Sequence, residues 1–276
     1  LVSNPHPPAI TMTPPESAKA GFSEQARMSD SGAPSYTPFR TTFACLSLHQ
    51  RDRIQMMQFP PEDVSAIRNV IQHHWKKGLQ SERVYSASYE FKLSGYPWFG
   101  QGSDAITSRV VVREIFAYLF SQGWILHLST DVSKNKYDKD SLIFRKQQTP
   151  PPPSEFIAIT FNQGDRMRLI GAPNALLADI RTLLKEMNLL QAEDWKDPKL
   201  EAWEYKMYGW PWHAIGEETM TTRLLLLKLL ETLESRGWSV YASIDQSTGT
   251  KNISETDSWY VVKERGWVEG SAVFHR

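Results

Sequence analysis

The chain has 276 residues, of which 41% are hydrophobic and 12% aromatic, so it carries enough apolar side chain for one large core or two small ones. Its 31 Lys and Arg residues balance its 31 Asp and Glu residues. The resulting formal net charge of +0 excludes a global basic field that would draw the chain to nucleic acid or to an anionic membrane. We therefore expect a soluble globular protein that does not bind nucleic acid.

The apolar runs are too short to cross a membrane, which requires about 20 consecutive apolar residues. The longest, Val110–Phe120 and Leu224–Leu233, are interrupted by charged residues and are predicted to be core helices. The single cysteine, Cys45, excludes an intramolecular disulfide and is typical of a reducing compartment. We expect a cytoplasmic protein, with the nucleus as the alternative location.

Two segments of low complexity divide the chain. Residues 1–40 are rich in Pro, Ser and Ala and lack an apolar period, which predicts a disordered arm because little surface can be buried there. The sequence TPPPP at Thr149–Pro153 predicts a polyproline linker at 149–154. What remains is unit one, at 41–148, and unit two, at 155–276.

The two units are similar to each other in sequence. Short motifs of unit one recur in unit two in the same order and at a nearly constant spacing, which indicates an internal duplication. The matched pairs are Asp52-Arg53 with Asp165-Arg166, Glu90-Phe91-Lys92 with Glu204-Tyr205-Lys206, Gly95-Tyr96-Pro97-Trp98 with Gly209-Trp210-Pro211-Trp212, Arg109 with Arg223, Gly123-Trp124 with Gly237-Trp238, Ser129-x-Asp131-x-Ser133 with Ser243-x-Asp245-x-Ser247, and Asp140-Ser141 with Asp257-Ser258.

Hydrophobic periodicity predicts the order β-α-β-α-β-β in each unit, and thus an α+β protein. The second helix of each unit is apolar over most of its circumference, which predicts that it lies between layers or between the units. We expect the two units to form an intramolecular pseudo-dimer through their sheets or their second helices. In unit one the expected elements are a strand over Phe43–Phe59, a helix over Val64–Trp75, a strand over Tyr85–Leu93, a helix over Thr107–Gln122, and strands over Trp124–Thr130 and Ser141–Lys146.

The loop after Gly-x-Pro-Trp in unit one can be interpreted in two ways. Its Gly100-Gln101-Gly102-Ser103-Asp104-Ala105 precedes a helix that carries Arg109, an arrangement that can place backbone amides near a phosphate. Unit two lacks the glycine pattern and adds Glu217 and Glu218, which suit a helix N-terminus but repel an anion. A structural turn with charged capping is the alternative.

No metal site or cofactor is expected. The polar cluster from Asp131 to Asp140 places oxygens at the first positions of a calcium loop but has Lys136 in place of the required glycine and Leu142 in place of the closing glutamate. His73 and His74 are adjacent, so they point to different faces of a helix and do not complete a zinc site. A solvated hairpin loop is the interpretation we favour for the cluster.

Catalytic patterns are also weak. Cys45 and His49 can share one face of a strand as a thiol–imidazole pair, but a buried cysteine beside an exposed histidine explains them equally. The sequence has no G-x-S-x-G nucleophile motif. Charged residues kept in both units, such as Arg109 and Arg223, are more typical of ion pairs and caps than of a repeated active site. We therefore favour a protein that is not an enzyme and leave catalysis open as the alternative.

The motifs Gly95-x-Pro97-Trp98, Gly123-Trp124 and Ser129-x-Asp131-x-Ser133, with Arg109 and the stretch Asp138–Arg145, resemble those of an uncharacterised tandem-repeat family of eukaryotic proteins, found mainly in filamentous fungi. The resemblance covers both units and not the arm. It implies a eukaryotic intracellular setting and no mechanism. Unit two departs from the motif by lacking counterparts of Lys134 and Lys136.

These observations favour an interaction or scaffold module that presents aromatic and basic side chains of unit one to a protein partner. The alternative is a small-molecule or phosphate-binding protein, with catalysis left open, whose pocket lies near the Gly-x-Pro-Trp loop. A closed pocket where Lys92, Arg109 and Lys134 converge would favour the alternative. A flat exposed aromatic patch would favour the interaction module. The candidate binding residues are Lys92, Trp98, Phe99, Arg109, Lys134, Lys136 and Arg145.

Overall fold

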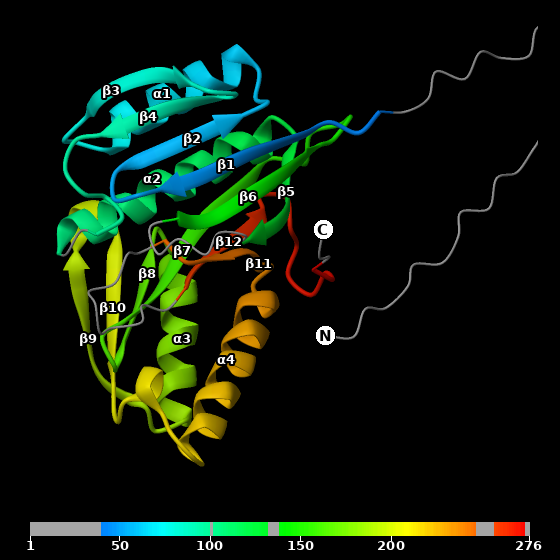
Figure 1. Ribbon diagram of the computed structural model, residues 1–276. Coiled ribbons are helices and arrows are strands. Elements are labelled where there is room, and N and C mark those ends of the chain that lie inside the picture. Colours follow the sequence, from blue (N-terminus) through cyan, green and yellow to red (C-terminus); the bar gives the residue numbers. More distant parts are fainter. Residues whose placement is uncertain (1–39, 100–101, 132–137, 247–256, 274–276) are drawn as a thin grey trace, which may run out of the picture. The chain divides into compact units, whose positions relative to one another are not determined.

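The duplication appears as two six-stranded antiparallel sheets with the same strand order (Figure 1). The computed structural model describes residues 40–99, 102–131, 138–246 and 257–273. The expected disordered arm at 1–40, apart from Arg40, lies outside these residues, as do Lys134 and Lys136.

Unit one contains sheet one, in the order β3-β4-β2-β1-β6-β5, and two helices. Its elements are β1 (Phe43–His49), β2 (Arg53–Met57), α1 (Pro61–His74), β3 (Leu79–Tyr85), β4 (Ser88–Leu93), α2 (Ser103–Ser121), β5 (Trp124–Thr130) and β6 (Asp138–Lys146).

Unit two contains sheet two, in the equivalent order β11-β12-β7-β8-β10-β9. Its elements are β7 (Ser154–Asn162), β8 (Arg166–Ile170), α3 (Asn174–Glu186), β9 (Leu190–Asp197), the 3₁₀ turn η1 (Pro198–Leu200), β10 (Ala202–Met207), the 3₁₀ turn η2 (Pro211–His213), α4 (Glu218–Ser235), β11 (Ser239–Ile244) and β12 (Ser258–Glu264).

The α+β class is confirmed, but the expected order β-α-β-α-β-β has too few strands. The stretch predicted as one strand over Phe43–Phe59 is a hairpin, β1 and β2, that turns at Gln50 with a φ of 54°. Gln163 turns the matching hairpin of unit two with a φ of 53°. Each glutamine side chain accepts a hydrogen bond from the arginine three residues later, which supports a turn that lacks the usual Gly or Asn-Gly signal.

The Gly-x-Pro-Trp motif anchors each helix-bearing loop to its sheet. Trp98 is fully buried, and its Nε1 donates to the carbonyl oxygen of Arg53 at 3.0 Å. Trp212 makes the matching bond to the carbonyl of Arg166 at 2.8 Å. Because a buried indole N–H needs an acceptor, these bonds fix the loop in both units.

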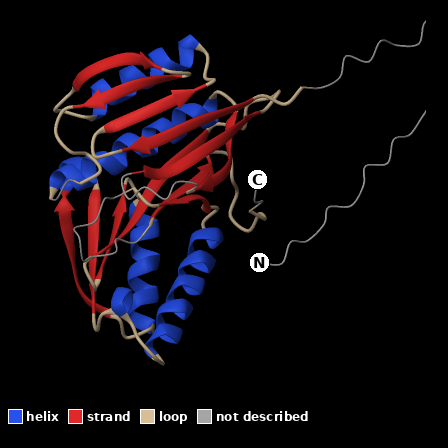
Figure 2. Ribbon diagram, in the orientation of Figure 1, coloured by secondary structure: helices blue, strands red, loops and turns tan. Residues whose placement is uncertain are grey.

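Helix α2 is buried on all sides because it packs against both sheets of the compact body formed by Thr41–Arg276. Phe116 meets the ring of Tyr260 at 4.9 Å, and Phe120 meets that of Phe156 at 5.4 Å. Figures 1 and 2 show the helix between sheet one and strands β7 and β8. The units are thus joined, as expected of fused copies, but the interface connects unlike surfaces: a helix of unit one and the outer face of sheet two.

This packing explains a difference between the first strands of the two units. In β7 the residues from Phe156 to Thr160 are all buried, whereas β1 alternates between buried and partly exposed positions. A strand covered on both faces needs a continuous apolar run, and a strand with one wet face needs alternation. The sequences FIAITF and FACLSLH follow these two rules.

A buried carboxylate stabilises unit one. Asp63 accepts hydrogen bonds from Trp124 Nε1 at 2.7 Å and from the Tyr118 hydroxyl at 2.8 Å. Burial and the contact with Asp63 raise the pKa of Tyr118, so its hydroxyl remains a donor.

We predict that Asp63→Ala lowers the free energy of unfolding by about 2–4 kcal/mol, because two donors in the core lose their acceptor. Denaturant unfolding measures the change. Glu62→Ala, at the exposed neighbouring position, is the matched control. An equal effect of the two substitutions would contradict the assigned role of Asp63.

Candidate functional site

The predicted binding residues do not converge. Lys92 lies on the outer face of sheet one, where its Nζ is 3.9 Å from Asp52 Oδ2. Arg109 lies on α2, which packs on the other side of that sheet, and its guanidinium donates to Ser258 Oγ at 3.3 Å and to the carbonyl of Ala105 at 3.3 Å. Arg109 therefore joins the two units and does not point toward Lys92.

The remaining predicted residues are scattered. Trp98 is in the core, and the ring of Phe99 lies 5.2 Å from the guanidinium carbon of Arg51. Arg145 lies on β6, opposite Phe43 of β1. The positions of Lys134 and Lys136, and of Gly100 in the glycine-rich loop, fall outside the described residues.

The charged residues shared by both units form ion clusters on the sheets. Glu90 accepts from Arg83 Nε at 3.0 Å and from Gln55 Nε2 at 2.9 Å, and it pairs with Arg53. In unit two, Glu204 pairs with Arg168 and accepts from Arg166 at 2.5 Å. Burial by itself would raise the pKa of each glutamate, but the hydrogen bonds and positive charges outweigh burial and lower it.

These lowered pKa values link stability to pH. A glutamate whose pKa is lower in the folded state stabilises the fold at neutral pH, and this contribution is lost as the pH falls below the ordinary value of 4.5 and through the folded-state pKa.

We predict that Glu204→Gln is less stable than the wild type at neutral pH and that the difference shrinks between about pH 5 and pH 2, because the wild-type carboxylate becomes protonated. Urea unfolding across this range measures it, with the exposed Glu201→Gln as control. An unchanged slope of stability against pH in Glu204→Gln would show that the cluster does not contribute.

An apolar row crosses the outer face of sheet one. It comprises Met57, Cys45, Ile143 and Leu128, which are in register on β2, β1, β6 and β5. Met57 is 40% exposed and Leu128 is 50% exposed. We call these four residues the sheet-one row.

Unit two has the same row in the same register, and there it is buried. Ile170, Ala158, Tyr260 and Ala242 occupy the matching positions of β8, β7, β12 and β11. Sheet two is covered on this side by α2. The sheet-one row is thus the uncovered counterpart of an internal contact surface. A comparison of the two sequences could have indicated this difference, because apolar and polar residues alternate in β1 whereas β7 is continuously apolar.

Cys45 is part of this row, and its surroundings bear on the thiol–imidazole hypothesis. Burial raises the pKa of the Cys45 thiol, which disfavours the reactive thiolate. The environment of Cys45 therefore supports its role as a small apolar side chain.

A second exposed apolar surface lies on α4. This helix buries Leu225, Leu229 and Leu233 against its own unit. Its opposite side exposes a stripe of apolar residues at helical spacing, Met220 (55%), Leu224 (48%) and Leu227 (58%), which we call the α4 stripe. The matching positions of α2 are Ile106, Val110 and Arg113.

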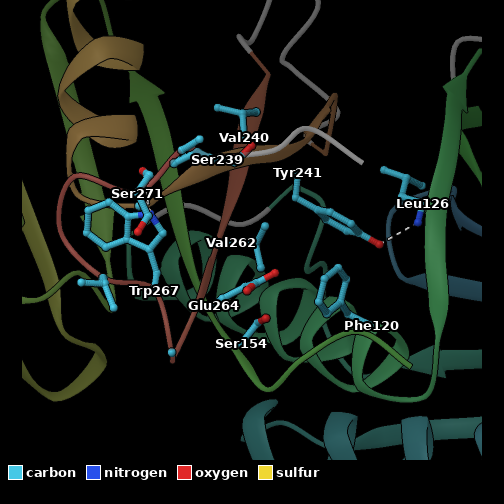
Figure 3. A pocket seen from close by; sticks show the side chains of 15 residues that line it. Phe120, Leu126, Ser154, Ser239, Val240, Tyr241, Val262, Glu264, Trp267 and Ser271 are labelled. Atoms are coloured by element: carbon cyan, nitrogen blue, oxygen red, sulfur yellow. Dashed lines mark hydrogen bonds between the residues drawn. The ribbon is translucent and has the colours of Figure 1, made fainter. Parts of the chain in front are cut away.

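A cavity of about 350 Å³ lies between the edge of sheet two and the segment that follows β12 (Figure 3). Its lining combines apolar and aromatic side chains, such as Phe120, Tyr241 and Trp267, with the polar Ser239 and Glu264. The Tyr241 hydroxyl accepts from the backbone N–H of Leu126 at 2.7 Å, and burial raises the pKa of Tyr241. None of the predicted binding residues lines this cavity.

Trp267 closes the cavity next to Gly237. A Cβ atom at Gly237 would lie 2.3 Å from the Trp267 ring, and the residue has a φ of 80°. Gly123, the counterpart in unit one, has a φ of 81°, but a Cβ there would make only ordinary contacts.

We predict that Gly123→Ala costs about 1–2 kcal/mol of stability from the backbone conformation alone, and that Gly237→Ala costs more because Trp267 must move. Denaturant unfolding gives both values, and tryptophan fluorescence reports the displaced ring. Equal losses in the two variants would show that Trp267 does not pack on Gly237.

Two classes of site find no support among the residues that the structure describes. No group of His, Cys, Asp and Glu side chains in them is arranged to hold a metal ion. None of their helices is both long and apolar enough to cross a membrane.

Comparison with known proteins supports the duplication. One family model, of a domain with no assigned function, matches the chain twice, at residues 42–145 and 155–262. The curated proteins and the solved structures give no match. The double match confirms the tandem repeat that the sequence motifs indicate.

Proposed function

The chain belongs to this family of uncharacterised repeated domains, and we propose that it is a non-enzymatic interaction module that binds a protein partner on the outer face of sheet one. One observation carries the proposal. The row that is buried beneath a helix on sheet two is open on sheet one, although it is apolar in both.

The chemistry around the row suits a protein partner. Phe43 and His127 form a ring pair at 5.6 Å beside it, and Arg145 lies opposite Phe43 on the neighbouring strand. Apolar and aromatic side chains flanked by basic ones are the usual composition of a protein-binding surface. The face also carries Lys92, whose Nζ lies 3.9 Å from Asp52, and Arg53, which pairs with Glu90.

The phosphate-binding alternative has less support. It requires Lys92 and Arg109 to approach one ligand, and they lie on opposite sides of sheet one. Arg109 is also engaged by Ser258 and the Ala105 carbonyl.

We predict that the double variant Met57→Lys/Leu128→Lys loses protein partners that the wild type captures from an extract of its source cells. Charges at these two exposed positions oppose burial beneath a partner while leaving the core intact. Quantitative mass spectrometry of the captured proteins is the measurement, and circular dichroism checks the fold.

The matched control is Val84→Lys, since Val84 is exposed on β3 but lies opposite Tyr89, on the helix side of the sheet. Partners retained by Val84→Lys and lost by the double variant would support the proposal. Identical partners for both variants would refute it.

A further inference from the structure

We propose that the partner of sheet one is the α4 stripe of a second copy of this chain, so that chains stack head to tail. The inference rests on the proposed function, because it names the occupant of the same face. Each chain already contains one such contact, in which α2 of unit one lies on sheet two. Among the described residues, the outer face of sheet one and the α4 stripe are exposed, and they correspond to the two sides of that contact.

The internal contact provides the template. On the helix side, Arg109 donates to Ser258, Phe116 meets the ring of Tyr260, and Phe120 meets Phe156. Phe120 also meets the ring of Tyr241 at 5.5 Å.

Sheet one keeps the receiving positions of this template. Ser141 corresponds to Ser258, and Ile143 corresponds to Tyr260, since Cys45 pairs with Ile143 as Ala158 pairs with Tyr260. The Phe43–His127 ring pair at 5.6 Å repeats the Phe156–Tyr241 pair at 5.4 Å. Both sheets also carry the same irregularity in the edge strand, between Leu126 and Leu128 and between Val240 and Ala242.

Helix α4 keeps the inserting positions. Arg223 and Leu230 correspond to Arg109 and Phe116, and Leu224 corresponds to Val110. In α2 both Val110 and Arg109 are buried, and Arg109 donates to Ser258 of sheet two, whereas on α4 Leu224 is 48% exposed and Arg223 is also exposed. By the template, Arg223 of one chain faces Ser141 of the next. Leu227 of the α4 stripe corresponds to Arg113, which donates to the carbonyl of Ile170 at 3.3 Å, so Leu227 lies over Met57 of the sheet-one row.

Some residues differ between the internal contact of α2 with sheet two and the proposed contact of α4 with sheet one, and these differences are complementary in charge. Glu234 occupies the position of Phe120 on the helix. Phe120 lines the cavity together with Tyr241 and Val262, whose counterparts on sheet one are His127 and Arg145. On the helix, the acidic Glu234 thus stands in place of Phe120. On the sheet, the basic His127 and Arg145 stand in place of Tyr241 and Val262. This complementary charge favours a second copy over an unrelated partner.

The contact is heterologous, so its geometry leaves one helix stripe and one sheet face free after every addition. Chains therefore add to the stack until no free chains are left or the stack closes into a ring. An open stack, or a ring of more than two chains, has a weight-average mass in solution above that of a dimer.

Sedimentation velocity of the full chain over a wide range of concentration tests the inference. We expect a mass that rises with concentration past the dimer. The sheet variant Met57→Lys/Leu128→Lys and the helix variant Leu224→Lys/Leu227→Lys should each remain monomeric, and Val84→Lys should associate like the wild type.

Mixing gives a sharper result. The sheet variant keeps an intact α4 stripe and the helix variant keeps an intact sheet-one row, so a mixture should form a one-to-one heterodimer and nothing larger. A symmetric association through α4 alone would leave the sheet variant able to dimerise, which would overturn the head-to-tail arrangement.

Charge reversal tests the register. Glu234→Lys should weaken association, and combining it with Arg145→Glu in the same chain should restore it, because the pair then meets with its signs exchanged. Failure of the second substitution to restore association would overturn the proposed register.

A chain that stays monomeric at every concentration would overturn the inference. If the sheet variant then still loses captured proteins, the proposed interaction function stands with a different partner. If it loses none, the proposed function fails as well.

Discussion

The burial of α2 between two sheets is the constraint on which the rest of the structure depends. A helix covered on both sides must be apolar around its circumference, and α2 has eleven buried residues against three in α4. This burial joins the two units into one body and closes the outer face of sheet two. It also determines which surfaces stay open, because among the described residues no sheet covers the outer side of α4.

The same constraint explains why equivalent residues have different environments. Arg109 is buried at the junction, whereas its counterpart Arg223 is exposed on α4. The residues that keep the same environment are those that act within a unit: the Trp98 and Trp212 bonds to a strand carbonyl and the clusters around Glu90 and Glu204. These shared tryptophans and glutamates are therefore anchors of the fold, whereas the shared Arg109 and Arg223 are not equivalent. The surfaces available for binding are those where the two units differ in what covers them.

This distinction moves the candidate site away from the loops of unit one. The glycine-rich loop and the lysine-bearing hairpin of unit one carry residues that unit two lacks. The outer face of sheet one is a stronger candidate for the opposite reason: its apolar row is present in both units and covered in only one. A surface built for contact and left open is a more specific sign of a partner than a loop of varied sequence.

The sequence by itself determined the duplication, the α+β class and the apolar second helices, because these depend on local pattern and on comparing one copy with the other. It missed two strands in each unit, since turns such as those at Gln50 and Ser86 carry no glycine signal. Only the tertiary structure decided that Lys92 and Arg109 lie on opposite sides of a sheet and that α2, and not α4, is covered on both faces. Because the two units share one local sequence pattern, that pattern predicts the same contacts for both. Packing between residues far apart in the chain decides which unit makes each contact. The sequence pattern of one unit does not contain the positions of these distant residues.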